Sequence, residues 1–126
     1  MLARALNFEG KYDSAVNALD KCLEFFPDRK VPYEGIMVYL VEEYFRAGAY
    51  QKGLALASDM RKIYTDRLQY MARFPARFAR SVRYEQNDCL GILHEMNRRI
   101  KPFASLDKTV AEFVAQTEEN LQAYGI

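Results

Sequence analysis

Apolar residues recur at intervals of three and four along almost the whole chain, which is the spacing of an α-helix with one buried face. No segment sustains the alternation of apolar and polar residues that a half-buried strand requires. Only four prolines interrupt the pattern, at positions 27, 32, 75 and 102, where each separates two periodic segments. The sequence therefore predicts an all-α chain of six to seven helices with no sheet.

Glycine, proline and capping residues set the expected helix boundaries. A short first helix ends at Gly10, and a second, capped by Asp13 or Ser14, ends at Pro27. Further helices are expected over residues 33–47, 50–73, 81–101 and 105–124, with a short helical turn near Phe78. Ser81 and Ser105 are the predicted N-caps of the last two helices.

A short pattern occurs twice along the chain, at a spacing of 38 residues. Each copy has a glycine, a tyrosine two positions later and a small residue three positions after that: Gly10, Tyr12 and Ala15, then Gly48, Tyr50 and Gly53. The glycine permits a turn, the tyrosine packs over it, and the small residue lets the second helix approach the first closely. The alternative is an unrelated helical bundle in which the pair of patterns is coincidental.

The repeated pattern resembles the tetratricopeptide repeat, whose helix pairs stack side by side. The resemblance implies a single domain over residues 1–126: tetratricopeptide-like antiparallel helix pairs over 1–64 and an irregular helical part over 65–126. The spacing is longer than that of the family, and Thr65 stands where a proline would end the second pair. In this register the first helix is incomplete, so we expect a fragment of a longer chain whose truncated N-terminal repeat exposes apolar surface and favours a homo-oligomer.

In such arrays the first helix of each pair lines a concave groove, so the resemblance also implies a binding surface. The corresponding positions are Asn7, Phe8, Val38, Glu42, Phe45 and Arg46. Their mixture of aromatic and charged groups suits a protein partner, an extended peptide or the chain's own upstream segment. Phe45 has a simpler alternative role as a core residue. Glu43 is expected to lie away from the groove, as a solvated charge.

A second resemblance extends over most of the chain. The run Gly35–Gly53, residues 64–71 and the segment Arg73–Arg83 are similar to the C-terminal tail of certain large bacterial multipass membrane proteins, whose N-terminal region is similar to protein O-mannosyltransferases. The resemblance implies that glycosyl transfer resides in the membrane region of such a parent, and it transfers no catalytic residue. We therefore expect a non-catalytic interaction or scaffolding domain, the soluble tail of a larger bacterial membrane protein.

The formal net charge of +1 conceals an uneven distribution. Residues 1–59 carry seven basic and nine acidic side chains, residues 60–101 ten and four, and residues 102–126 one and four. Within the basic middle, four arginines recur at helical spacing among aromatic residues: Arg73, Arg77, Arg80 and Arg83. This basic surface either pairs with the acidic last helix (Glu112, Glu118, Glu119) or docks the 60–101 segment on an anionic membrane. Nucleic acid is the less favoured partner.

Residue types that carry catalysis or bind metal do not cluster. His94 is the only histidine, and the two cysteines, Cys22 and Cys89, lack metal-ligand spacing and are expected to be free and buried. Adjacent Glu42 and Glu43 point about 100° apart on a helix. We expect no catalytic, metal or cofactor site, the alternative being an enzyme with a cryptic pocket. The chain begins without a signal-peptide pattern, and the longest apolar run, Ile36–Val41, is too short to span a membrane.

Overall fold

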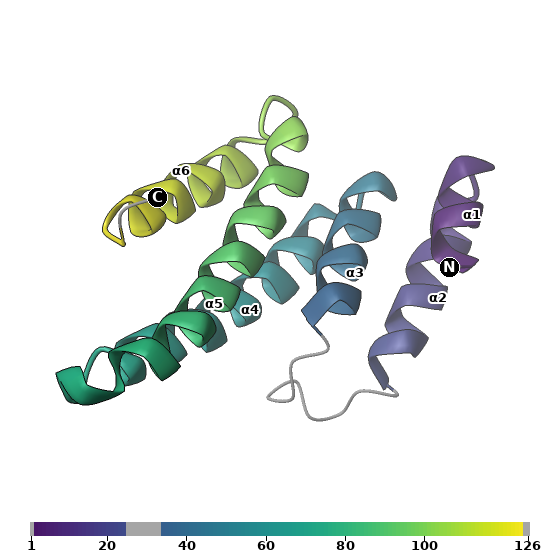
Figure 1. Ribbon diagram of the computed structural model, residues 1–126. Coiled ribbons are helices and arrows are strands. Elements are labelled where there is room, and N and C mark those ends of the chain that lie inside the picture. The colour runs from purple at the N-terminus through teal and green to yellow at the C-terminus, as the bar shows by residue number, and fades with distance from the viewer. Residues whose placement is uncertain (1, 25–33, 125–126) are drawn as a thin grey trace. The chain divides into compact units, whose positions relative to one another are not determined.

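A computed structural model describes residues 2–24 and 34–124. Within these ranges the chain forms six α-helices, two short 3₁₀-helices and no strand, which confirms the prediction of an all-α protein (Figure 1). The elements in chain order are α1 (Leu2–Phe8), α2 (Tyr12–Glu24), α3 (Glu34–Arg46), α4 (Tyr50–Met71), η1 (Ala76–Phe78), α5 (Ala79–Ile100), η2 (Lys101–Phe103) and α6 (Lys108–Gln122).

Contacts between residues group the chain into two compact units, Met1–Ala57 and Ser58–Ile126. The boundary falls inside α4, so each unit contains part of that helix. The predicted end of α2 at Pro27 lies outside the described residues.

The turns after α1 and α3 have the same geometry. Gly10 and Gly48 adopt φ angles of +80° and +81°, a conformation that glycine adopts without steric cost. After α1, the Lys11 amide donates to the Leu6 carbonyl at 2.8 Å, and after α3 the Ala49 amide donates to the Tyr44 carbonyl at 2.9 Å. Both helices therefore end in a Schellman motif, at the two glycines that the sequence pattern singled out.

In the first unit the core is built mainly from α3, with smaller contributions from α1, α2 and the start of α4. Five residues that recur at helical spacing on α3 are all buried: Met37, Leu40, Val41, Tyr44 and Phe45. Ala15 and Leu19 of α2 are fully buried beside them. In the short α1, Ala3 and Asn7 point inward, while Phe8 is 94% exposed.

A polar cluster on Asp20 also holds the first unit together. Its carboxylate accepts hydrogen bonds from Tyr44 Oη and from Lys52 Nζ, each at 2.7 Å. Burial acts to raise the pKa of Asp20, but the hydrogen bonds from Lys52 and Tyr44 outweigh it, so the pKa is lowered. The cluster connects α2 with α3 and with the first turn of α4.

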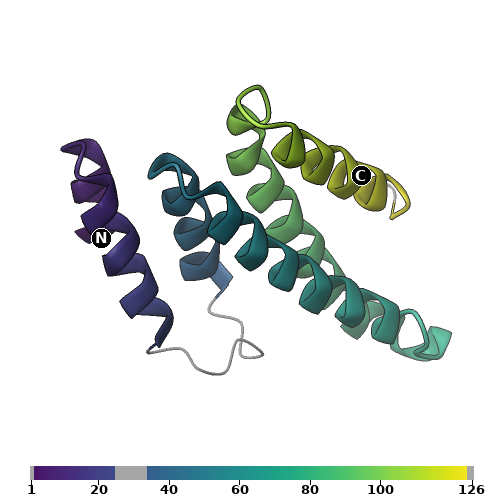
Figure 2. The same ribbon diagram turned by 180° about the vertical axis from the view of Figure 1, so that it is seen from behind.

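The second unit is organised around α5 and α6. Figures 1 and 2 both show the chain reversing after α5 and returning as α6. On α6, residues at intervals of three and four form one buried face: Val110, Phe113, Val114, Thr117 and Leu121. It packs with the buried side chains of α5, among them Leu93, Met96 and Ile100. The second half of α4 adds Met60, Tyr64, Leu68 and Met71 to the buried set.

Four predictions need correction: three N-caps and the burial of one cysteine. Asp13 and Ser14 lie inside α2, which begins at Tyr12, so neither caps that helix. Ser105 does not cap α6; Asp107 does, because its extended backbone (φ −148°, ψ 127°) lets its carboxylate accept from the Thr109 amide at 2.7 Å. Ser81 lies inside α5, which begins directly after η1 at Ala79. Both cysteines are free as expected, but only Cys89 is buried and Cys22 is half-buried.

Candidate functional site

The chain reverses between α4 and α5 at Pro75. The Arg73 and Phe74 amides donate back to the carbonyls of the last turn of α4, at 3.2 Å each, and Pro75 then turns the chain away with φ −58° and ψ 153°. Proline has no amide proton and clashes with the preceding helical turn, so it ends the helix at this point. The short η1 follows and leads directly into α5.

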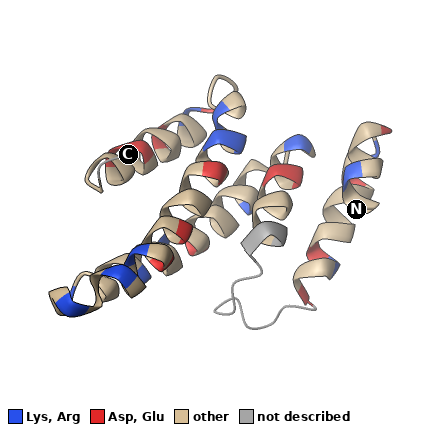
Figure 3. Cartoon of the chain, viewed as in Figure 1, with Lys and Arg blue, Asp and Glu red and all other residues tan. Residues whose placement is uncertain are grey.

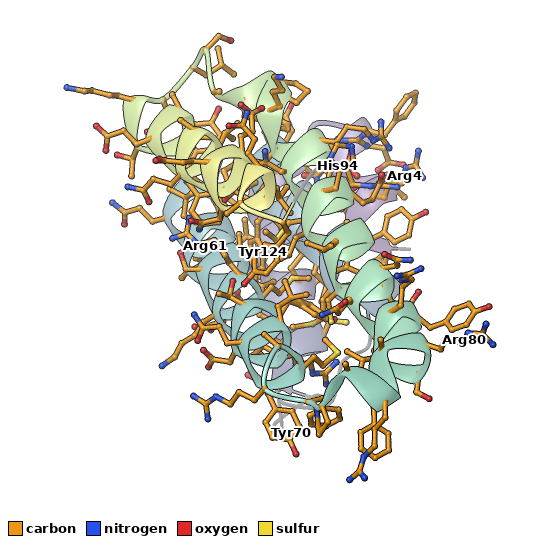
Figure 4. The ribbon with its side chains drawn as sticks, turned by 60° about the vertical axis from the view of Figure 1, so that its left-hand side comes forward. Arg4, Arg61, Tyr70, Arg80, His94 and Tyr124 are labelled. Atoms are coloured by element: carbon orange, nitrogen blue, oxygen red, sulfur yellow. The ribbon has the colours of Figure 1, made fainter. Side chains whose placement is uncertain are left out.

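Four exposed aromatic side chains surround this reversal: Tyr70, Phe74, Phe78 and Tyr84. The Tyr70 and Phe74 rings lie 5.1 Å apart at an interplanar angle of 71°, and the Phe74 and Phe78 rings lie 6.3 Å apart at 68°. Both are edge-to-face contacts, the geometry that the ring quadrupole favours. Three rings thus form one apolar cluster, although Tyr70 remains 61% exposed; Figure 4 shows Tyr70 at the outer end of the unit.

All four predicted surface arginines, Arg73, Arg77, Arg80 and Arg83, are exposed in this region. The Arg77 guanidinium lies 4.9 Å from the centre of the Phe78 ring, within cation–π range. Residues 67–84 contain five arginines and no acidic residue. Figure 3 shows the resulting blue segment where α4 passes into α5. We use the name arginine–aromatic tip for the surface formed by these four arginines and the four exposed aromatic residues: Arg73, Arg77, Arg80, Arg83, Tyr70, Phe74, Phe78 and Tyr84.

The expected pairing between these arginines and the last helix is not observed. Glu118 of α6 forms its ion pair with Lys101, at 3.2 Å. Within the ranges that the structure describes, none of the four arginines forms an ion pair, and neither do Glu112 and Glu119. The positive charge of the arginine–aromatic tip is therefore directed to solvent, where a ligand can reach it.

The structure places the six predicted groove residues in different environments. Asn7, Val38 and Phe45 are buried and contribute to the interior of the first unit. Phe8 is almost fully exposed on α1. Glu42 and Arg46 pair with each other at 2.9 Å across one helical turn of α3. Half of the predicted set is thus packed inside the unit, while the other half remains accessible or partly accessible.

Glu43 was expected to be solvated, and this expectation is wrong. Its side chain is 1% exposed. Asn7 Nδ2 donates to Glu43 Oε2 at 2.7 Å and to the Glu43 carbonyl at 3.0 Å, and Arg46 lies 3.4 Å from Oε1. The carboxylate is therefore a buried link between α1 and α3. Its partner lies 36 residues away, so no local pattern could have identified it.

His94 lines an open pocket of about 240 Å³ in the second unit, beside Asn97, Lys101 and Glu118. His94 is exposed, and Glu118 is the one carboxylate among the residues that line this pocket. That carboxylate is already paired with Lys101. Among the described residues, no three histidine, cysteine or acidic side chains come close enough together to hold a metal ion.

Comparison with protein-family models, with curated proteins and with solved structures finds no match to this chain. Separately, none of the helices in residues 2–24 and 34–124 combines the length and apolar character needed to cross a membrane.

Proposed function

We propose that this chain is a non-catalytic helical module that attaches to anionic membrane surfaces through the arginine–aromatic tip. One observation carries the proposal: exposed arginines that form no ion pair with any described residue flank a cluster of exposed aromatic rings at a single helix reversal. Arginines near an anionic bilayer gain attraction from its negative surface potential. Tyrosine is enriched at the level of the lipid headgroups, and apolar side chains such as phenylalanine insert just below it.

The arrangement of the rings favours lipid over nucleic acid. Single-stranded nucleic acids bind to aromatic residues by stacking a base on an open ring face. In the tip, Phe74 is engaged edge-to-face with both Tyr70 and Phe78. This ring cluster exposes apolar surface but no parallel ring faces on which bases could stack. The interfacial zone of a bilayer accommodates such apolar surface whatever the orientation of the rings.

Vesicle co-sedimentation tests the proposal. We expect binding to vesicles of phosphatidylserine and phosphatidylcholine, no binding to phosphatidylcholine alone, and loss of binding as salt shortens the Debye length. Replacing Arg73, Arg77 and Arg80 with glutamine should weaken binding about a hundredfold, since each basic residue contributes about 1 kcal/mol at such a surface.

A matched control removes the same charge elsewhere. Arg4→Gln, Lys21→Gln and Lys108→Gln change three exposed basic residues that have no ion pair among the described residues. This variant should bind the same vesicles nearly as well as the unmodified chain. Equal loss in both variants would contradict the tip as the binding surface, and tighter binding to a single-stranded oligonucleotide than to the vesicles would assign the tip to nucleic acid.

We further propose that the first unit is a tetratricopeptide-like pair of helix hairpins. Two observations support this. The turns at Gly10 and Gly48 have the same dihedral angles and hydrogen bonds, and the small residues at the matched positions, Ala15 and Gly53, lie at buried positions. The similarity to the tail of mannosyltransferase-like membrane proteins supports a related proposal: such a parent would hold this module beside a bilayer.

Protein interaction through α1 is a second candidate function, because Phe8 is an almost fully exposed phenylalanine with Leu2 exposed on the same short helix. An exposed apolar surface of this kind favours association. Light scattering over a range of concentrations should show a dimer that the Phe8→Ser variant lacks. A monomer at every concentration would remove self-association as a function of this helix.

A further inference from the structure

A second accessible site lies between α4 and α6, within the second unit. It is an open pocket of about 330 Å³ lined by polar side chains from one face of each helix. On α4 the lining residues recur at spacings of three and four, and so do those on α6, so each helix presents one continuous polar stripe. No residue of the arginine–aromatic tip contributes to this lining.

Arg61 is the central cation of this pocket, and its neighbours fix its position. Its guanidinium lies 4.3 Å from the centre of the Phe113 ring, and Nη1 donates to Thr117 Oγ1 at 3.3 Å. The Thr117 hydroxyl donates its own proton to the Phe113 carbonyl at 2.8 Å, so it offers Arg61 a lone pair. Figure 4 shows Arg61 on the side of α4 that faces α6. The guanidinium is thus oriented before any ligand arrives.

The charge of Arg61 lacks a counter-ion. Arg61 forms no ion pair with any described residue. Partial burial lowers its pKa, which is the effect expected when a cation loses water without gaining an anion. A guanidinium has five N–H donors in a planar fork, and Thr117 uses one of them. The remaining donors suit an oxyanion, which a carboxylate fills with two parallel hydrogen bonds.

The other charges in the pocket restrict which anion it accepts. Lys62 adds a second cation, while Asp66 and Glu119 add two carboxylates. The lining is therefore neutral overall, so it offers a dianion such as phosphate no net electrostatic attraction. A ligand with one carboxylate and one ammonium group satisfies both signs, and the amides of Gln116 and Asn120 supply neutral hydrogen-bonding groups.

We propose that this pocket binds a small amino-acid-like zwitterion, with the ligand carboxylate on Arg61 and its ammonium group toward Asp66 and Glu119. The pocket is open and the ligand small, so a Kd of about 0.1–1 mM is expected. The proposal is independent of membrane attachment, because the tip and the pocket share no residue.

The test uses NMR titration of the full chain with glycine, β-alanine and γ-aminobutyrate, which differ in the separation of their two charges. Butyrate, butylammonium and inorganic phosphate serve as single-sign probes. We expect at least one zwitterion to shift the Arg61 Nε–H resonance and the amides of α6, with a Kd at least threefold lower than that of butyrate or phosphate. No shift at about 20 mM of any zwitterion would overturn the proposal, and so would tighter binding of phosphate.

Variants separate a ligand site from a purely structural arginine. Arg61→Gln should weaken zwitterion binding at least tenfold, and Arg61→Lys, which keeps the charge but loses the fork, should weaken it less. Lys108→Gln removes a positive charge from the exposed start of α6 and should leave the Kd unchanged. Circular dichroism checks that each variant is folded. Binding that persists unchanged in both Arg61 variants would overturn the assignment.

Discussion

The ring of Phe45 lies against Gly53, so close that a Cβ at position 53 would stand 3.0 Å from Phe45 Cε2. Phe45 is the last core residue of α3, and its ring also lies 5.8 Å from that of Tyr50, at the start of α4. The small residue at position 53 is therefore a packing requirement, as the repeated sequence pattern predicts. It lets the first turns of α4 approach the end of α3 inside the first unit.

Alanine substitutions at two glycines should separate this packing requirement from helix propensity. Gly91, in α5, has no atom within 4 Å of an added Cβ, so Gly91→Ala should raise the free energy of unfolding by about 0.5–1 kcal/mol. Gly53→Ala gains the same propensity but forces the Phe45 ring to move, at a cost of about 1–3 kcal/mol. Urea denaturation should therefore show Gly53→Ala as the less stable variant. Equal stabilisation by both would contradict the close approach of Phe45.

Removing the amide partner of the buried Glu43 should destabilise the first unit. Asn7→Leu leaves the Glu43 carboxylate without its 2.7 Å hydrogen bond, and the expected loss is about 1.5–3 kcal/mol because that bond is made to a charged group. Asn17→Leu, on the exposed side of α2, provides the control and should change stability by less than about 0.5 kcal/mol. The double variant Asn7→Leu with Glu43→Leu should recover stability, since neither polar group then remains unpaired. No recovery would argue against a specific pair.

The start of α6 depends on Asp107 rather than on the nearby serine. Asp107→Ala removes the side chain that accepts from the Thr109 and Val110 amides, and the expected cost is about 1 kcal/mol. Ser105 makes only a 3.5 Å contact with the Pro102 carbonyl, so Ser105→Ala should have little effect. Thermal unfolding of the two variants distinguishes them. A larger loss of thermal stability in Ser105→Ala than in Asp107→Ala would show that Ser105 is the N-cap, as the sequence predicted.

Acidification should remove the contribution of Glu95 to the free energy of unfolding. Hydrogen bonds from Arg98, opposed by burial and aided by Arg99, lower its pKa from 4.5 to about 2. The folded state therefore binds this proton less readily than the unfolded chain, so the stabilisation is complete above pH 4.5 and is lost as the pH falls toward 2. Because the side chain is 37% exposed, solvent screening keeps the effect below about 1 kcal/mol. The stability difference between the unmodified chain and Glu95→Gln should shrink over this interval; a difference that grew on acidification would contradict the pairing.

Periodicity predicted the parts of the fold in which one helix face is buried over several turns. The inward faces of α3 and α6 are the clearest examples. It assigned no inward face to α1, which has seven residues, because two turns contain too few positions to separate Phe8 outward from Asn7 inward. The N-cap of α6 was misassigned to Ser105 because Ser105 and Asp107 both occur before the helix, and only the backbone dihedral angles distinguish them.

The candidate sites also contain features that the sequence predicted and features that it did not. The exposed arginines of the tip were predictable, since their helical spacing and the excess of basic residues around them are local properties of the sequence. The environments of Glu43 and Arg61 were not, because their partners Asn7 and Thr117 lie 36 and 56 residues away. A charged residue on a helix is ordinarily assigned to solvent unless a distant partner is known.

The most direct test of membrane attachment is a fluorescence measurement at the tip. The chain contains no tryptophan, so Phe78→Trp introduces a single reporter beside Arg77, and Tyr12→Trp introduces a matched one on α2 in the other unit. On vesicles rich in phosphatidylserine, the reporter at position 78 should shift to the blue and be quenched by brominated acyl chains, while the reporter at position 12 should do neither. Quenching at position 12 without quenching at position 78 would contradict the account.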